Sequence, residues 1–251
     1  MKKQPLYLCA LLLCTFLLAG KSALAQKDTT VWMTSLEYRV HDESVYEKNY
    51  PTVKAWWLKA DADIEFARIA QTSESGRVYG SVLFKGADNL GAYIARRVKN
   101  LEKFNAENPA IGKENRENIN GPVMRAIWMR IDSISYQEPG YNRDNFPFRK
   151  IVFISVLADK MKDFEAGMRK QAQLDASHGI KYNSIVFRCT DGYPANTYMV
   201  VLPDKSLLDY YKNREARKMK REQFKSEYAP LHRLSNDITT VMRIDHLTIV
   251  K

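Results

Sequence analysis

The chain has 251 residues, a formal net charge of +10 at pH 7 and an aromatic content of 11%. This length is enough for one large hydrophobic core or two small ones. The plentiful aromatic residues and the ordinary charged fraction of 27% exclude an intrinsically disordered chain.

Residues 1–25 have the features of a secretory signal peptide. Lys2 and Lys3 are followed by an apolar run at 6–19 that is short for a bilayer span, and residues 23–25 have the small-x-small pattern of a cleavage site. We therefore expect an exported protein, periplasmic or secreted, without stable membrane insertion after cleavage. A retained anchor and lipidation at Cys14 are the alternatives, and the bulky Leu13 disfavours the second.

Cys189 is the only cysteine of the expected mature chain, so no intramolecular disulfide can form. It lies in an apolar strand pattern, which favours a small buried side chain over a reactive thiol. An exported protein with a single cysteine fits a bacterial periplasm.

Residues 26–137 are predicted to form a first half of the fold. Alternation of apolar residues indicates strands and 3.6-residue spacing indicates helices. The predicted elements are a strand at 32–40, a helix from N-cap Asp42 with a kink or restart at Pro51, hairpin strands at 64–70 and 77–84, a helix around 90–104, a polar loop at 105–122 and a closing strand at 124–137.

Residues 138–148 contain Pro139, Gly140 and Pro147 and are predicted to be a linker. Residues 149–251 form the second predicted half, in the same order. Its elements are a strand at 150–157, a helix from N-cap Asp159 to a C′ residue at Gly179, strands at 184–190 and 197–202 around a turn at 191–194, a long basic helix at 205–228 and a closing strand at 237–250.

An internal duplication supports this division. The closing strands of both halves contain the sequence Met-Arg-Ile-Asp, at residues 129–132 and 242–245. Each half has the ferredoxin-like order β-α-β-β-α-β, which leaves one face of its sheet without helices. Because an apolar sheet face must be buried, we predict an α+β fold in which two tandem ferredoxin-like halves pack sheet to sheet as a pseudo-dimeric barrel.

This arrangement resembles the dimeric α+β barrel superfamily, which includes antibiotic-biosynthesis-monooxygenase-like, stress-response-barrel-like, NIPSNAP-like and chlorite-dismutase-like proteins. The resemblance covers residues 32–250 and rests on the element order and the duplicated strand. Members range from cofactor-free oxygenases to haem proteins and proteins of unknown role, so the resemblance implies a fold and leaves the function open.

Strand alternation predicts which side chains line the barrel lumen. Val152, Ile154 and Val156 give the second half an apolar wall, whereas the first half has a polar wall. A small-molecule pocket is therefore predicted in the first-half lumen, with the ligand-binding residues Glu37, Arg39, Trp128, Arg130 and Asp132. The alternative is that the Arg/Asp pairs are structural ion pairs, which the duplication favours for Arg243 and Asp245.

The histidines show no metal-ligand spacing, and no metal or cofactor is predicted. Haem is the alternative that the resemblance allows, with His178 or His232 as the candidate ligand. The basic helix at 205–228 contains interleaved acids and is predicted to be a solvated surface and not a nucleic-acid site.

These observations predict an exported bacterial barrel protein that binds a small amphipathic ligand in the lumen. Two alternatives remain open, a cofactor-free oxygenase-type enzyme acting on an aromatic substrate and a haem-binding barrel. No phosphate-binding loop, nucleophile elbow or zinc motif is present in the sequence.

Overall fold

The computed structural model describes residues 28–73 and 76–250. The predicted signal peptide, residues 1–25, lies outside the described residues. Among the helices of this described part, none is long and apolar enough to cross a bilayer.

The first half contains four strands and three helices. They are β1 (Val31–Val40), α2 (Glu43–Ala60), β2 (Phe66–Thr72), β3 (Arg77–Lys85), α3 (Ala87–Glu107), α4 (Pro109–Glu117) and β4 (Ile119–Arg130). Asp42 caps α2 as predicted, since its carboxylate accepts a hydrogen bond from the Ser44 amide at 2.8 Å. The helix continues through Pro51 without a restart.

The second half repeats this order. Its elements are β5 (Phe148–Val156), α5 (Met161–Ser177), β6 (Ile185–Asp191), β7 (Thr197–Asp204), α6 (Leu207–Glu222), α7 (Lys225–Ile238) and β8 (Thr239–Ile249). Gly179 follows the C-cap residue of α5 with a φ of 61°, which confirms its predicted C′ position.

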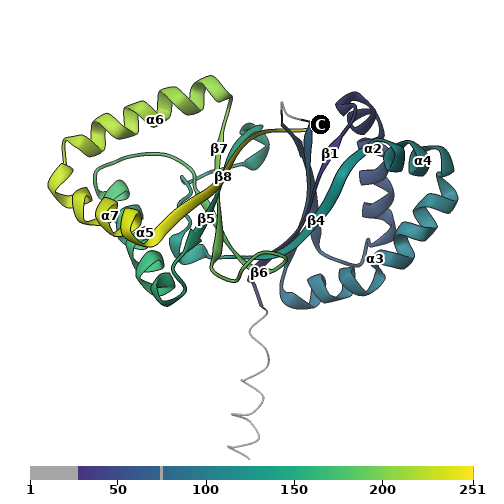
Figure 1. The fold of residues 1–251 in the computed structure, drawn as a ribbon, viewed down its shortest axis with the longest axis horizontal. Coiled ribbons are helices and arrows are strands. Elements are labelled where there is room, and N and C mark those ends of the chain that lie inside the picture. The colour runs from purple at the N-terminus through teal and green to yellow at the C-terminus, as the bar shows by residue number, and fades with distance from the viewer. Residues whose placement is uncertain (1–27, 74–75, 251) are drawn as a thin grey trace, which may run out of the picture.

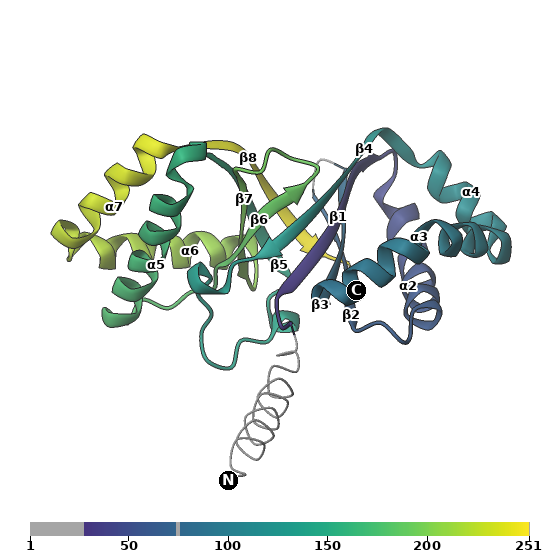
Figure 2. The same ribbon diagram turned by 90° about the horizontal axis from the view of Figure 1, so that it is seen from below.

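The eight strands close into one antiparallel barrel in the order β1-β3-β2-β8-β5-β7-β6-β4. Two seams join the halves, β2 with β8 and β4 with β6. The helices of the first half cover one side of the barrel and those of the second half cover the opposite side (Figures 1 and 2). The predicted fold class is therefore confirmed.

The barrel interior is a packed core to which both halves contribute. Trp128 of β4 lies at its centre with no exposed surface, and its ring contacts Phe153 of β5 at a centroid distance of 5.9 Å. The other buried apolar members of this cluster are Met33, Tyr79, Ala126, Ile151, Phe187, Cys189, Met199 and Leu247. Because the two halves share this core, neither can bury its inner sheet face alone.

Each half has a separate core between the outer face of its sheet and its own helices. In the first half this core is aromatic and contains Trp57, Phe84 and Tyr93. In the second half it is mainly aliphatic, with Val156, Val186 and Ile238 around Phe164 and Tyr198.

The predicted loop at 105–122 is wrong, because α4 occupies much of it. Pro109 is the first residue of this helix, a position where its missing N–H costs nothing. Gly112 lets the helix approach α3 closely, since a Cβ atom there would lie 2.4 Å from Asn105 Oδ1. Gly112 and Asn105 of this segment therefore belong to a tight contact between α4 and α3.

The single helix predicted at 205–228 is two helices, and the region before the last strand is helical. α6 ends at Glu222, and the chain turns so that Phe224 stacks on His178 at a centroid distance of 3.6 Å. The predicted cap Asp159 is also wrong, because Asp159 lies in a short 3₁₀ segment and Lys160 precedes α5 without a side-chain cap.

Candidate functional site

The barrel lumen contains a buried network of charged and phenolic groups. Arg243 Nη2 donates to Glu37 Oε2 at 2.6 Å, and Arg243 Nε donates to Asp245 Oδ2 at 2.7 Å. Tyr193 Oη donates to Glu37 Oε1 at 3.1 Å, and Tyr79 Oη donates to Asp245. The network links strands of both halves.

Arg77 Nη1 lies 4.0 Å from Glu37 Oε2, so two guanidinium groups balance the two carboxylates of the network, which favours a structural role. Burial disfavours the Arg243 charge, but the neighbouring Tyr79, Glu37 and Asp245 outweigh it and raise the Arg243 pKa. The guanidinium also lies over the Phe153 ring at 4.1 Å. Two carboxylates, two guanidinium groups and two phenols thus satisfy one another without a ligand.

The structure does not bring the five predicted ligand-binding residues together in the lumen. Glu37 and Trp128 lie there, and Trp128 Nε1 donates to Ser35 Oγ at 2.9 Å. Arg39 is exposed. β1 and β3 keep one register through Arg39, so Arg39 has the strand parity of Glu37, but it lies one residue from the end of β1.

Arg130 and Asp132 form an ion pair of 2.6 Å outside the lumen network, with the Asp132 side chain 62% exposed. Here β4 ends at Arg130 and Asp132 begins a 3₁₀ turn, whereas β8 continues through the same Met-Arg-Ile-Asp sequence. The identical sequences therefore differ in structure, and the predicted convergence with Glu37 does not occur.

The predicted apolar wall of the second half has the wrong strand parity. Ile151 and Phe153 face the lumen, whereas Val152 and Ile154 pack on the helix side. β5 is apolar on both faces, so its sequence pattern does not indicate which of its side chains face the lumen.

Two cavities lie outside the barrel, one in each half, between the sheet and its helices. The first-half cavity has a volume of about 410 Å³. Its wall includes the aromatic residues Tyr38, Tyr46, Tyr50, Trp57, Tyr93 and Phe104. Four arginines line it, Arg68, Arg97, Arg116 and Arg125, and no carboxylate is among its described lining residues.

Arg68 is the polar centre of this first-half cavity. It projects from β2, and its guanidinium carbon lies 5.2 Å from the centroid of the Trp57 ring. Its Nη1 atom is buried and has no hydrogen-bond partner in the described structure. A buried N–H without an acceptor is costly, and an anionic ligand in the cavity would satisfy it.

The phenols around Arg68 remain protonated. Burial raises the pKa of Tyr38 to about 12 and raises that of Tyr93, in both cases partly offset by the Arg68 charge. Burial also raises the pKa of Tyr46 and Tyr50. The cavity therefore combines arginine cations, with Arg68 at the centre, with neutral hydroxyl donors.

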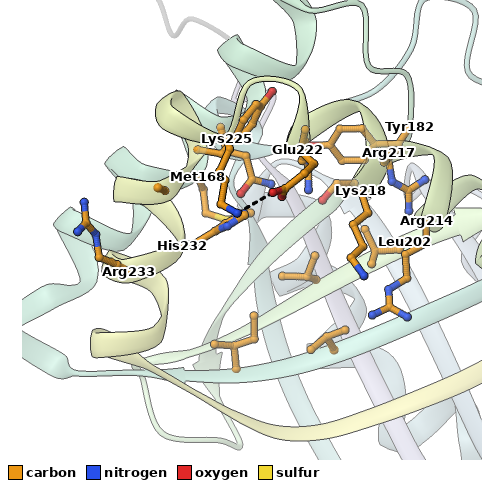
Figure 3. A pocket seen from close by; sticks show the side chains of 18 of the residues that line it. Met168, Tyr182, Leu202, Arg214, Arg217, Lys218, Glu222, Lys225, His232 and Arg233 are labelled. Carbon is orange, nitrogen blue, oxygen red and sulfur yellow. Dashed lines mark hydrogen bonds and ion pairs between the residues drawn. The ribbon is translucent and has the colours of Figure 1, made fainter.

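The second-half cavity is larger, about 780 Å³, and chemically different. Its floor is aliphatic, formed by Val152, Ile154, Met168, Val200 and Leu202. Its rim carries cations of α6 and α7, of which Figure 3 shows Arg214, Arg217, Lys218, Lys225 and Arg233. Glu222 is the only carboxylate among the described lining residues, and it pairs with Lys225 at 2.7 Å.

The two candidate haem ligands differ in position. His178 stacks on Phe224, and its Nε2 lies 3.2 Å from a Glu227 carboxylate oxygen, so the protein already uses both its ring face and its nitrogen. His232 lines the second-half cavity but is exposed. The described residues therefore place no buried, free imidazole over the aliphatic floor, and the fit to haem is poor.

Sequence reasoning missed both cavities, although each left a signal. Arg68 is a lone charge within an apolar strand, which is unusual for a residue that packs beneath helices. Arg217 was assigned to a solvated helix face, but it is half-buried and lies over Tyr182 at 5.4 Å.

The sequence matches no family model, and no curated protein matches it. Solved structures share its fold at low identity. A monooxygenase-like protein from Lactobacillus acidophilus is 9% identical, with a TM-score of 0.54 over 88% of this chain and 95% of that chain. An anthrone-oxidase-like protein is 10% identical, with a TM-score of 0.56 over 90% of this chain and 93% of that chain.

A chlorite-dismutase-like protein is also similar, with 10% identity and a TM-score of 0.52 over 89% of this chain and 96% of that chain. These similarities confirm the predicted α+β barrel fold. At this identity they show the fold alone.

Proposed function

We propose that this protein binds a small planar aromatic anion in the first-half cavity. The observation that carries the proposal is the buried Nη1 of Arg68, which has no hydrogen-bond partner and lies in a wall of aromatic rings. The proposal keeps the amphipathic ligand expected from the sequence but moves it from the packed lumen to the outer face of the first sheet. Export to the periplasm or outside the cell, inferred from residues 1–25, is part of the same proposal.

The chemistry of the cavity matches such a ligand on two counts. A carboxylate, sulfonate or phenolate would accept a charge-assisted hydrogen bond from Arg68, which is worth more than a neutral one. A flat ring would pack against Trp57, Tyr93 and Phe104 in the offset or edge-on geometries that aromatic groups prefer. A volume of about 410 Å³ lies within the usual range for small-molecule sites.

Two fluorescent probes of similar shape test the proposal. 8-Anilinonaphthalene-1-sulfonate carries a negative charge, whereas N-phenyl-1-naphthylamine is neutral. We expect Arg68→Met to weaken binding of the sulfonate by about tenfold or more and to change binding of the neutral probe by less than about twofold. The matched control Arg125→Met removes an exposed arginine of the same wall and should leave both affinities nearly unchanged.

Equal losses for the two probes in Arg68→Met would show that Arg68 shapes the cavity without recognising charge. Binding that survives Arg68→Met but is lost in Arg217→Met would place the anion in the second-half cavity. Either result would reject the proposed site.

A second candidate function is cofactor-free oxidation of the bound aromatic compound. Arg68 among protonated tyrosines would stabilise the enolate form of a substrate such as anthrone, and two of the similar structures are monooxygenase-like and anthrone-oxidase-like. In that reaction anthrone and O₂ give anthraquinone and water.

An oxygen electrode tests this candidate directly. We expect O₂ consumption with anthrone to exceed that of heat-inactivated protein and to fall in Arg68→Met to the uncatalysed rate. Equal rates for the natural protein and the variant would reject this activity and would leave the binding proposal to be judged by the probes.

A further inference from the structure

We infer that the second-half cavity binds a long-chain amphiphile with an anionic head group, such as a fatty acid carboxylate. This inference is independent of the proposed function, because it concerns a different cavity, formed by other strands and helices. The argument rests on the floor of the cavity, on its rim and on the surface beside its opening.

The floor suits a flexible hydrocarbon chain. Its residues from β5 and β7 are Val152, Ile154, Val200 and Leu202, with Met168 contributed by α5. Aliphatic side chains offer no flat face on which a ring would stack, whereas methyl and methylene groups pack well against a chain of methylenes. Each methylene transferred from water to such a floor contributes about 0.8 kcal/mol.

The rim contains two cations of α6, Arg217 and Lys218, that pair with no carboxylate in the described structure. Arg221 is occupied by the buried Asp175, with Nε–Oδ1 at 2.8 Å, and Lys225 is occupied by Glu222. The described structure places no carboxylate within 4 Å of Arg217 or Lys218, and both line the cavity. Figure 3 shows their side chains near that of Arg214, which lies one turn earlier on α6.

Arg217 is the best placed of these cations to hold a head group. Its guanidinium carbon lies 5.4 Å from the Tyr182 ring centroid and 5.9 Å from the Tyr210 ring centroid, which fixes its position between two rings. Burial lowers its pKa, and the neighbouring Arg221 charge adds to this effect. An anion beside Arg217 would relieve both penalties.

The apolar floor continues to the protein surface. Val152 of β5 pairs with Ile244 of β8, and Ile244 is 47% exposed. Met242 on the same strand is 48% exposed. A chain longer than the cavity therefore has an apolar path beyond it, a feature that a compact ligand would not need.

Displacement of the fluorescent fatty acid cis-parinarate measures binding in the full-length mature protein. We expect oleate to displace the probe and oleyl alcohol, which has a similar chain and no charge, to displace it at least about tenfold more weakly. Acetate, which has the head group without the chain, should not compete at millimolar concentration.

Two variants locate the site. Arg217→Gln should weaken oleate binding by about tenfold and leave oleyl alcohol binding within about twofold. The control Lys212→Gln removes the same charge from α6 at an exposed position outside the cavity lining and should leave both unchanged. Leu202→Gln places a polar group on the floor and should weaken both ligands together. Thermal melts confirm that each variant remains folded.

Three results would overturn the inference. Equal affinity for oleate and oleyl alcohol would remove the role of the charged rim. Equal effects of Arg217→Gln and Lys212→Gln would show only general attraction by a basic helix. Hemin that displaces parinarate, gives a Soret band at one equivalent and loses that band in His232→Ala would assign the cavity to a tetrapyrrole.

Discussion

Arg243 on β8 donates a hydrogen bond of 2.6 Å to Glu37 on β1, so a buried ion pair joins the last strand of the second half to the first strand of the first half. The Glu37 side chain is only 5% exposed. Burying both charges is favourable only while each retains its partners, because an isolated charge in a protein interior is very costly.

Removal of Arg243 should therefore be strongly destabilising. Arg243→Met removes the guanidinium that pairs with both Glu37 and Asp245 and leaves only Arg77, 4.0 Å from Glu37, beside the two carboxylates, so we expect a loss of about 3 kcal/mol in the free energy of unfolding. The control Arg130→Met breaks an ion pair whose carboxylate is 62% exposed and should cost less than about 1 kcal/mol. Urea denaturation of both variants measures the difference. Similar losses would contradict the structural role of the lumen network.

The buried phenols should make the protein sensitive to alkaline pH. Burial, together with the Glu37 charge, raises the pKa of Tyr193 to about 12, and burial raises that of Tyr38 to about 12. A raised pKa means that the folded state prefers the protonated phenol. This contribution to stability is complete below about pH 10, the ordinary tyrosine pKa, and is lost as the pH rises toward about 12.

Absorbance at 295 nm between pH 9 and 13 measures this ionisation. We expect a group of tyrosines that ionises near pH 12, together with loss of near-ultraviolet circular dichroism. Tyr193→Phe should reduce the amplitude of that late step. Full ionisation of all tyrosines near pH 10 in a folded protein would be inconsistent with the buried network.

Gly192 in the β6–β7 turn should not tolerate a side chain. Its φ is +94°, and a Cβ atom there would lie 2.1 Å from Arg125 O and 2.8 Å from Ala126 Cα. Gly121 is a matched control, since its φ is +98° and no atom lies within 4 Å of a Cβ placed there. We expect Gly121→Ala to cost about 1 kcal/mol and Gly192→Ala to cost clearly more, about 3 kcal/mol.

Equilibrium unfolding of the two glycine variants separates backbone strain from steric conflict. Both lose the conformational freedom of glycine, but only Gly192→Ala forces the turn away from β4. Because Tyr193 follows directly, Gly192→Ala should also weaken the Tyr193–Glu37 hydrogen bond. Equal costs at the two positions would show that the turn moves freely.

The barrel should unfold as one cooperative unit. Each half supplies part of the central core, and the seams β2–β8 and β4–β6 are its only described strand pairings across the halves. Residues 149–251 expressed alone should aggregate, form a molten state or self-associate, because their inner sheet face lacks its partner. A soluble monomeric half with sharp thermal unfolding, observed by analytical ultracentrifugation and calorimetry, would refute the shared core.

The order of strands and helices was predictable because turn residues and apolar periodicity divide the chain clearly. Parity was predictable only where a strand has a polar face. The alternation around Glu37 correctly placed this residue in the lumen, whereas β5, apolar on both faces, gave the opposite assignment from the observed one. The error arises because β5 is covered by helices on its outer face and by the shared core on its inner face, so both faces are apolar.

The candidate sites depended on tertiary features that local patterns do not encode. Arg39 is exposed near the end of β1, and the early end of β4 moves Asp132 to the surface. The cavities lie between sheets and helices, so their existence depends on how far each helix stands from its sheet. Arg68 is recognisable in the sequence as a charged residue in an apolar strand. The sequence does not show that its buried Nη1 atom lacks a hydrogen-bond partner.

The separation of the two outer cavities from the common lumen has a consequence for how the two halves can diverge. A substitution in the lumen changes a core built by both halves, so a compensating change must arise in the other half as well. A substitution in the wall of one outer cavity can be compensated by other residues of the same half. The two outer cavities differ in this way: the first-half cavity has an aromatic wall around Arg68, and the second-half cavity has an aliphatic floor beneath Arg217. One ancestral unit could in this way acquire two binding specificities while its inner surface stayed constrained by its copy.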